Sequence, residues 1–250
     1  MQRWRLAIEY DGGPFVGWQR QANGLSVQAL LEEAIGRLTG ERTTVVGGAR
    51  TDAGVHALGQ VAHVDLARDI APERLAAGLN AHLRPHPVSV LDARRVGANF
   101  HARFSALRKS YLYRILARRA PPALERGRVW HVPPDLDAER MHDAAQALVG
   151  RHDFTSFRAA ECQARSPVKT LELLHVQRKG AIVEIRAVAR SFLHHQVRNI
   201  VGTLVRVGLG REDVGWPARV LAARDRRLAG PTAPACGLYL ERIDYPPEEE

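Results

Sequence analysis

The sequence predicts an α+β protein of two similar halves, each with the element order β-α-β-β-α-β. With 250 residues the chain is long enough for two domains of ordinary size. Segments with strand-like alternation and segments with helix-like apolar spacing follow one another in the same order twice. Strands in this order form antiparallel sheets with helices on one face, the ferredoxin-like or RRM-like arrangement that many RNA-binding domains use. We expect an N-terminal α/β domain at 1–104, a C-terminal α/β domain at 105–245 and a disordered tail at 246–250.

A half-buried strand opens the first half. Trp4, Leu6, Ile8 and Tyr10 alternate with polar or small residues, and a glycine-rich turn follows. Ser26 is a favourable N-cap for the helix that comes next. The remaining elements are expected as a helix over 27–38, a short strand at 43–46, a strand at 60–66, a helix over 72–83 and a strand at 88–96.

The second half repeats this order with one additional helix. The basic segment 99–107 has no clear period and marks the boundary between the halves. The segment 151–168 contains three arginines and little periodicity, which predicts a long loop with a function. The expected elements are a strand at 110–116, a helix over 138–149 behind Asp137, strands at 170–177 and 181–188, a helix over 192–207, a short helix behind Trp216 and a strand at 238–243.

The charge balance suggests a polyanionic partner. The chain has 36 Lys and Arg against 27 Asp and Glu, a net charge of +9, and all but three of the basic residues are arginine. Arginine makes bidentate phosphate contacts and stacks on bases, so nucleic acid is one interpretation. A genome rich in GC codons would produce the same excess without a function.

The cysteines and the N-terminus argue for a cytoplasmic protein. Cys162 and Cys236 lie far apart and form no CxxC, so we expect neither a disulfide framework nor a zinc site. The N-terminus carries charge in place of an apolar core, and no apolar run reaches the length of a membrane span.

The segment GGARTDAGVHALGQVAHV, 47–64, contains the most informative carboxylate. Asp52 stands alone among glycines and alanines, which leave room for a planar ligand to approach the backbone. Arg50 is placed to keep it ionised or to hold a phosphate, and an ionised carboxylate suits a nucleophile or a base. The alternative is that Asp52 only caps a turn.

Other chemistries have weaker support. Asp65 is the end of an alternating strand and gives no second carboxylate for glycoside hydrolysis. The histidines lack cysteine partners and an HExxH motif, so no metal site is expected. The glycines of GGPFVG match neither a dinucleotide fingerprint nor a phosphate-binding loop, and no nucleophile elbow occurs.

Six segments carry recognisable motifs in chain order. They are IEYDGGPFVGWQRQ, ARTDAGVHALGQVAHVD, NFHARFSALRKSYLYRI, HDFTSFRA, FLHHQVRNIVGTLVRVG and GLYLERIDY. Together they closely resemble the tRNA pseudouridine synthase A family over nearly the whole chain, and RTDAGVHA with HHQVRNIVG is highly specific. Ala49 departs from the glycine that the family usually has before the arginine, but Arg50 and Asp52 stay in register.

The resemblance implies roles for three residues. Asp52 would be the catalytic carboxylate, Tyr111 the aromatic residue that packs on the target base, and Arg198 the partner of Asp52. Taken alone, Tyr111 reads as a core residue, and Arg198 with His194 reads as the solvated edge of a helix. Further substrate contacts are expected at Arg20, Arg50, Arg158, Arg165, His194 and Leu238.

The resemblance also implies an activity and an assembly. The family isomerises uridine to pseudouridine at positions 38, 39 and 40 of the tRNA anticodon stem-loop as a homodimer. The half-sheets would join into one central sheet, with the active-site cleft between them. One carboxylate suffices for this isomerisation, so no metal or organic cofactor is expected. The residues leave open whether Asp52 attacks C1′ or removes the 2′ proton. They also leave open a non-catalytic RNA-binding protein and a nucleoside hydrolase.

Overall fold

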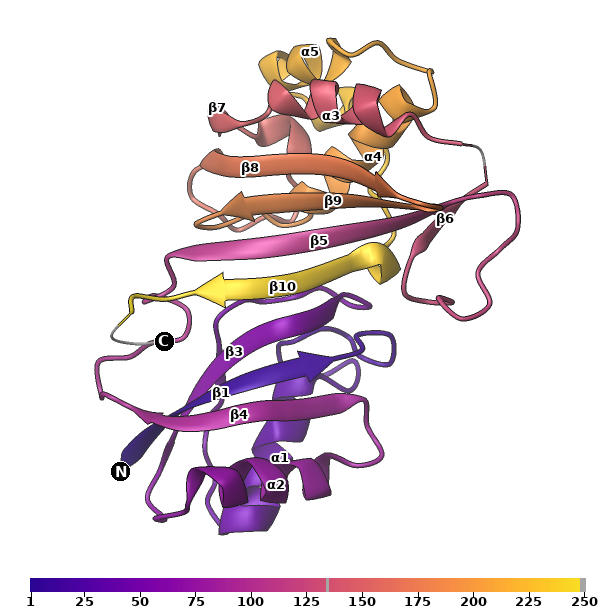
Figure 1. Ribbon diagram of the computed structural model, residues 1–250. Coiled ribbons are helices and arrows are strands. Elements are labelled where there is room, and N and C mark those ends of the chain that lie inside the picture. Colours follow the sequence, from indigo (N-terminus) through magenta and orange to yellow (C-terminus); the bar gives the residue numbers. More distant parts are fainter. Residues whose placement is uncertain (134, 248–250) are drawn as a thin grey trace. The chain divides into compact units, whose positions relative to one another are not determined.

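The computed structural model describes residues 1–133 and 135–247, which form a mixed α+β fold. This part of the chain has ten strands and five α-helices (Figure 1). It divides into two compact units. The first unit comprises Met1–Arg108 and the segment from Tyr239 onward, and the second comprises Lys109–Leu238.

In the first unit, β1 lies between two antiparallel neighbours, β3 and β4. The strand order is β4-β1-β3-β10, and the short β2 pairs with β3 beside it. This order of elements is the predicted β-α-β-β-α-β, followed by a strand from the C-terminal end of the chain. The elements are β1 Gln2–Tyr10, α1 Val27–Thr39, β2 Val46–Gly47, β3 His56–Leu66, α2 Pro72–Leu83, β4 Val88–Val96 and β10 Leu238–Asp244.

The helices of the first unit begin and end where the sequence signals stand. Ser26 Oγ accepts a hydrogen bond from the Ala29 amide at 3.2 Å, and Gly40 ends α1 in a left-handed conformation. Helix α1 packs on α2, and α2 packs on β4. Trp4, Leu6 and Ile8 of β1 are fully buried, as their alternation predicts.

Three strand predictions in the first unit need correction. The short strand expected at 43–46 is β2, only Val46–Gly47, and β3 begins at His56 instead of 60. Strand β10 pairs with β3 in parallel, so the sheet is not wholly antiparallel as expected. A Cβ on Gly59 would lie 2.6 Å from the Glu241 oxygen, so glycine allows this close approach. Because parallel neighbours can be far apart in sequence, local alternation does not reveal their pairing.

In the second unit, β9 lies between β5 and β8 in the order β5-β9-β8-β7, and all these pairs are antiparallel. The short β6 pairs with β5 in parallel and was not predicted. Helix α3 packs on β8 and on α4. The elements are β5 Arg108–Ala117, β6 Trp130–Val132, α3 Ala138–Gln146, β7 Gly150–Asp153, β8 Val168–Lys179, β9 Ile182–Ala189, α4 Gln196–Gly208 and α5 Trp216–Ala223.

Besides the unpredicted β6, α3 ends at Gln146 instead of 149, and two further segments of the second unit differ from the sequence prediction. Helix α4 begins at Gln196, four residues after the predicted start, because His195 before it has a left-handed backbone with φ 60°. The predicted loop 151–168 contains most of β7 and a 3₁₀ turn at Thr155–Phe157. Of the tail predicted at 246–250, residues 248–250 lie outside the described residues. None of the described helices combines the length and the apolar composition needed to cross a bilayer.

Candidate active site

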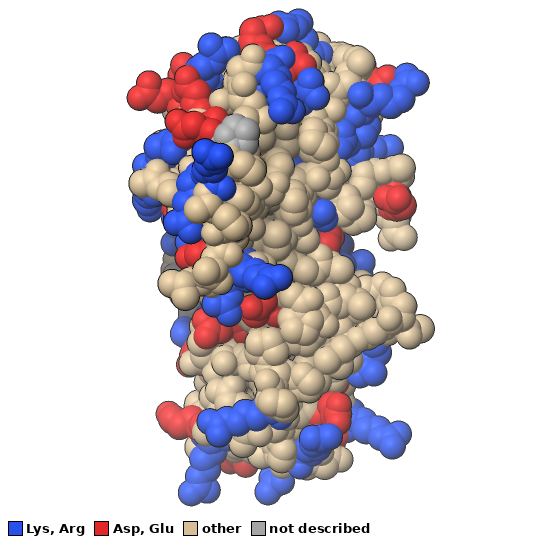
Figure 2. Space-filling view, turned by 90° about the vertical axis from the view of Figure 1, so that its right-hand side faces the viewer, with Lys and Arg blue, Asp and Glu red and all other residues tan. Residues whose placement is uncertain are grey.

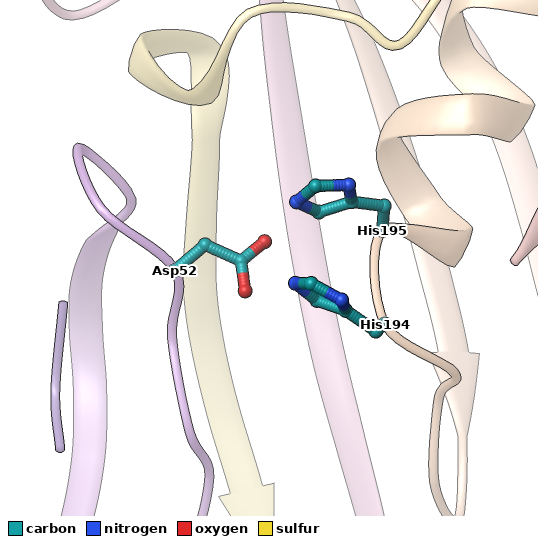
Figure 3. A group of neighbouring side chains, drawn as sticks. All are labelled: Asp52, His194 and His195. Atoms are coloured by element: carbon teal, nitrogen blue, oxygen red, sulfur yellow. The ribbon is translucent and has the colours of Figure 1, made fainter. Parts of the chain in front are cut away.

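The Asp52 loop is held against the segment that follows β1. Asp52 forms an isolated antiparallel bridge with Gly17, and the Trp18 amide donates to the Thr51 oxygen at 3.1 Å. Gly17 has φ 115°, and a Cβ there would lie 2.6 Å from the Thr51 oxygen. The Val55 amide donates to the Asp52 oxygen at 3.2 Å, which closes a turn. The half-buried Asp52 side chain projects from this loop (Figure 3).

Two buried polar side chains form hydrogen bonds to the same loop. Gln60 is fully buried, and its amide group accepts from the Ala49 N–H at 3.1 Å and donates to the Ala49 oxygen at 2.8 Å. The Tyr10 hydroxyl lies 2.7 Å from Thr51 Oγ1. Burial raises the pKa of Tyr10 to about 12, so the phenol stays protonated at neutral pH. The backbone on the N-terminal side of Asp52 is therefore fixed by hydrogen bonds that solvent cannot replace.

A third support lies at the start of β3. Nδ1 of His56 lies 3.0 Å from the Gly12 amide and 3.1 Å from the Asp11 carboxylate. The imidazole of His56 also stacks on Tyr239, with the ring centroids 4.8 Å apart. The sequence analysis did not predict that Tyr10, Gln60 and His56 support this loop. The signal that could have indicated Gln60 is a polar residue among the apolar residues of a predicted strand.

Two glycines of the loop lie against side chains of the protein itself. A Cβ on Gly47 would lie 2.4 Å from the Trp18 ring, and one on Gly48 would lie 2.8 Å from the Tyr245 hydroxyl. Glycine at these two positions therefore admits the protein's own side chains. Ala53, directly after Asp52, is exposed, and so is Arg50.

In the second unit, Tyr111 lies on β5 opposite Ala187 of β9. The side chain is largely buried, and Phe192 meets it edge-on with ring centroids 5.1 Å apart and planes at 87°. This contact fixes the orientation of the Tyr111 ring. Leu238, the first residue of β10, is also buried.

His194 and His195 precede α4, so His194 does not share a helix face with Arg198 as the sequence suggested. Their rings lie side by side with centroids 4.0 Å apart (Figure 3). The His194 oxygen accepts from the Ala159 amide at 3.0 Å, which ties this turn to the segment after the 3₁₀ turn. Gln196, fully buried, accepts from the Leu193 amide at 2.8 Å and fixes the turn from within.

Arg198 is half-buried in the first part of α4. Its Nε donates to the Ala233 oxygen at 2.7 Å, and the Ala233 amide donates back to the Arg198 oxygen at 3.1 Å. On the next residue, the Asn199 side chain donates to the Phe157 oxygen and accepts from Thr232. Arg198 and Asn199 of the QVRNIVG motif thus connect α4 to two separate segments, one at 232–233 and one at Phe157.

The predicted phosphate contacts differ in their surroundings. Arg20 forms an ion pair with Glu32 at 2.5 Å, so a phosphate would have to compete with a carboxylate for it. Arg165 is exposed, and Arg158 is half-buried after the 3₁₀ turn. On the face shown in Figure 2, basic groups are interspersed with acidic ones. Several arginines besides Arg20 also form ion pairs with carboxylates, so the net charge exaggerates how many can meet a polyanion.

Comparisons with known proteins cover nearly all of the chain. The sequence pattern described as tRNA pseudouridine synthase matches residues 6–105 and 144–246. A tRNA pseudouridine synthase A from Rhodospirillum centenum is 64% identical over 245 residues, which is 98% of this chain and 100% of the relative. Proteins of the same name from Azorhizobium caulinodans and Maricaulis maris are 58% and 56% identical over 246 residues, covering 98% of this chain and 95% and 99% of the relatives. Both the Asp52 loop and α4 lie within the matched residues.

Proposed function

Because the chain belongs to the tRNA pseudouridine synthase A family, we propose that it converts uridine to pseudouridine at positions 38, 39 and 40 of the tRNA anticodon stem-loop. The activity is that of tRNA pseudouridine synthase A, and the protein is an isomerase. The observation that carries the proposal is the position of Asp52. It lies within the matched residues, on a loop whose backbone is held by buried hydrogen bonds.

The proposed reaction loses no atom. The C1′–N1 bond of the uridine breaks, the uracil turns and a C5–C1′ bond forms, while C5 gives up its proton and N1 gains one. Asp52 starts the reaction either by attacking C1′ or by removing the 2′ proton. The departing uracil spreads its negative charge over two carbonyl groups, so no strong general acid is required. The chemistry requires neither a metal nor an organic cofactor.

Two residues of the second unit complete the proposed machinery. Tyr111 packs on the base of a flipped nucleotide, an arrangement supported by the edge contact of Phe192 that orients its ring. Arg198 is the electrostatic partner of Asp52, and its Ala233 contact supports a defined side-chain position. His194 and Leu238 lie next to these elements and are proposed to contact the substrate, as are Arg20, Arg50, Arg158 and Arg165.

The proposed assembly follows the family. We propose that an N-terminal α/β domain carries the Asp52 loop, that a C-terminal α/β domain carries Tyr111 and Arg198, and that the two sheets join with the active-site cleft between them. The protein would act as a homodimer in the cytoplasm, where one protomer grips the tRNA body while the other modifies the loop.

The test is a nucleoside analysis of tRNA after incubation with the purified protein. An unmodified transcript treated in the presence of a chelator should contain pseudouridine, and a matched transcript with cytidine at positions 38–40 should contain none. Unchanged uridine would identify a non-catalytic RNA-binding protein. Free uracil in solution would identify a nucleoside hydrolase.

A further inference from the structure

Phe104 is the one exposed aromatic side chain among the Phe, Tyr and Trp residues that the structure describes. Its side chain is 70% exposed, whereas the other phenylalanines are buried or half-buried. It belongs to the basic segment 99–107, to which the proposed reaction assigns no role. A singly exposed apolar side chain is ordinary in itself, so the groups around this ring decide whether it has a function.

The turn that presents Phe104 is rigid. The Ser105 amide donates to the His101 oxygen at 2.9 Å, and the His101 amide donates to Ser105 Oγ at 3.1 Å. Nδ1 of His101 accepts from the Arg103 and Phe104 amides, each at 3.2 Å. Four hydrogen bonds therefore hold the backbone that carries the ring before any ligand arrives.

The turn is also anchored in the core of the first unit. The His101 ring meets the buried His63 ring edge-on, with centroids 4.8 Å apart. His63 Nδ1 accepts from the Ala102 amide at 3.1 Å. Burial lowers the pKa of His63 to about 4, so it remains a neutral acceptor at physiological pH.

The Phe104 ring lies against a second aromatic ring, and an arginine lies over it. The His101 ring lies against Phe104 with centroids 4.3 Å apart and planes at 33°. The Arg103 guanidinium carbon lies 5.5 Å from the Phe104 centroid. Arg103 and Arg108 are both exposed. The turn thus combines an exposed aromatic surface with the cationic side chain of Arg103, the pairing typical of single-stranded nucleic-acid contacts.

We propose that Phe104 and Arg103 form a stacking platform for an unpaired base of the bound tRNA, other than the uridine that reacts. The proposal rests on the proposed function, which supplies the RNA. Stacking on Phe104 covers the exposed ring, and Arg103 neutralises an adjoining phosphate. A second copy of this chain fits the surface less well, because two such turns would bring like charges together.

The proposal is tested by binding of an unmodified tRNA transcript to three variants of Phe104. Phe104→Ala should weaken binding roughly 5- to 150-fold, the effect of losing one base–aromatic stack. Phe104→Trp should bind as tightly as the parent. Phe104→Leu keeps an apolar side chain but no ring and should bind almost as weakly as the alanine variant. Leu91→Ala, which removes another exposed apolar side chain, is the control and should not change binding.

The outcomes separate this proposal from the function on which it rests. Affinity unchanged in Phe104→Ala, or full affinity in Phe104→Leu, overturns the platform while pseudouridine formation stands. A parent dimer that dissociates on Phe104→Ala, measured by sedimentation without RNA, overturns it in favour of an interface between copies. A parent protein that forms no pseudouridine defeats the proposed function, and the affinities still decide the platform.

Discussion

The Asp52 loop and the segment 151–168 are both proposed to meet the tRNA, but their functional side chains are placed in different ways. The backbone around Asp52 is fixed by Gly17, Tyr10 and Gln60, and the supporting side chains are buried. In 151–168 the backbone is also held, since the Phe154 amide donates to the Pro167 oxygen and the Ala159 amide to the His194 oxygen, but Arg165 between these anchors is exposed. Chemistry at one carboxylate demands a precise position, whereas attraction of a polyanion requires only charge at the surface.

The largest effect should come from removing the charge of Asp52 while keeping its shape. We expect Asp52→Asn to lower the single-turnover rate at saturating tRNA by about 10²- to 10⁴-fold. Its affinity for tRNA should change little. The matched control is Asp65→Asn. Asp65 lies on β3, the strand after the Asp52 loop, and is paired with Arg3, so this variant should keep the rate. A normal rate for Asp52→Asn would remove the loop from the chemistry.

The next effect tests whether Arg198 acts on the reaction or only on the fold. Arg198→Ala should lower the turnover of bound tRNA on the order of 10²-fold, as loss of an electrostatic contact does. The salt dependence of binding should stay as in the parent. Arg206→Ala removes another arginine of α4, paired with Glu212, and should keep the turnover. Equal losses in the two variants would show that α4 needs its arginines for stability alone.

Gln60 tests the support of the loop. Gln60→Ala leaves the buried Ala49 N–H and oxygen without the side-chain partner they have now. We expect kcat to fall about 10- to 100-fold through misplacement of Asp52, with KM for tRNA little changed. Gln177→Ala, which loses a side-chain bond to Glu184, is the control for a generic glutamine loss. An intact kcat in folded Gln60→Ala would contradict the positional account.

The smallest effect concerns the surface arginines. The combined change Arg158→Ala and Arg165→Ala should flatten the slope of log K against log salt by about one to two units. Turnover of fully bound tRNA should be almost unaffected. Replacing Arg37 and Arg94, each in an ion pair, is the matched control for loss of two positive charges. An unchanged slope in the test variant would show that 151–168 does not meet phosphate.

The sequence could predict the helices and the long strands because each carries its own periodicity. Asp52 could be proposed as the candidate carboxylate because its motif is local and specific. The residues that support this loop could not be predicted. The Tyr10–Thr51 hydrogen bond joins residues 41 positions apart, and Gln60 bonds to the backbone of Ala49, which gives no signal in the side-chain pattern. The same reason explains why the pairing of β10 with β3 was missed. The later start of α4 depends on the left-handed His195, which has no signal in the amino-acid pattern.

The most direct measurement of the central claim is tritium release from tRNA labelled at C5 of one uridine, at position 39. The C5 proton leaves only if C5 becomes bonded to C1′, so release reports the isomerisation itself. We predict stoichiometric release by the parent protein, none by Asp52→Asn, and none from a transcript labelled only outside positions 38–40. Retention of the label by the parent protein, or release by Asp52→Asn at the parent rate, would contradict the account.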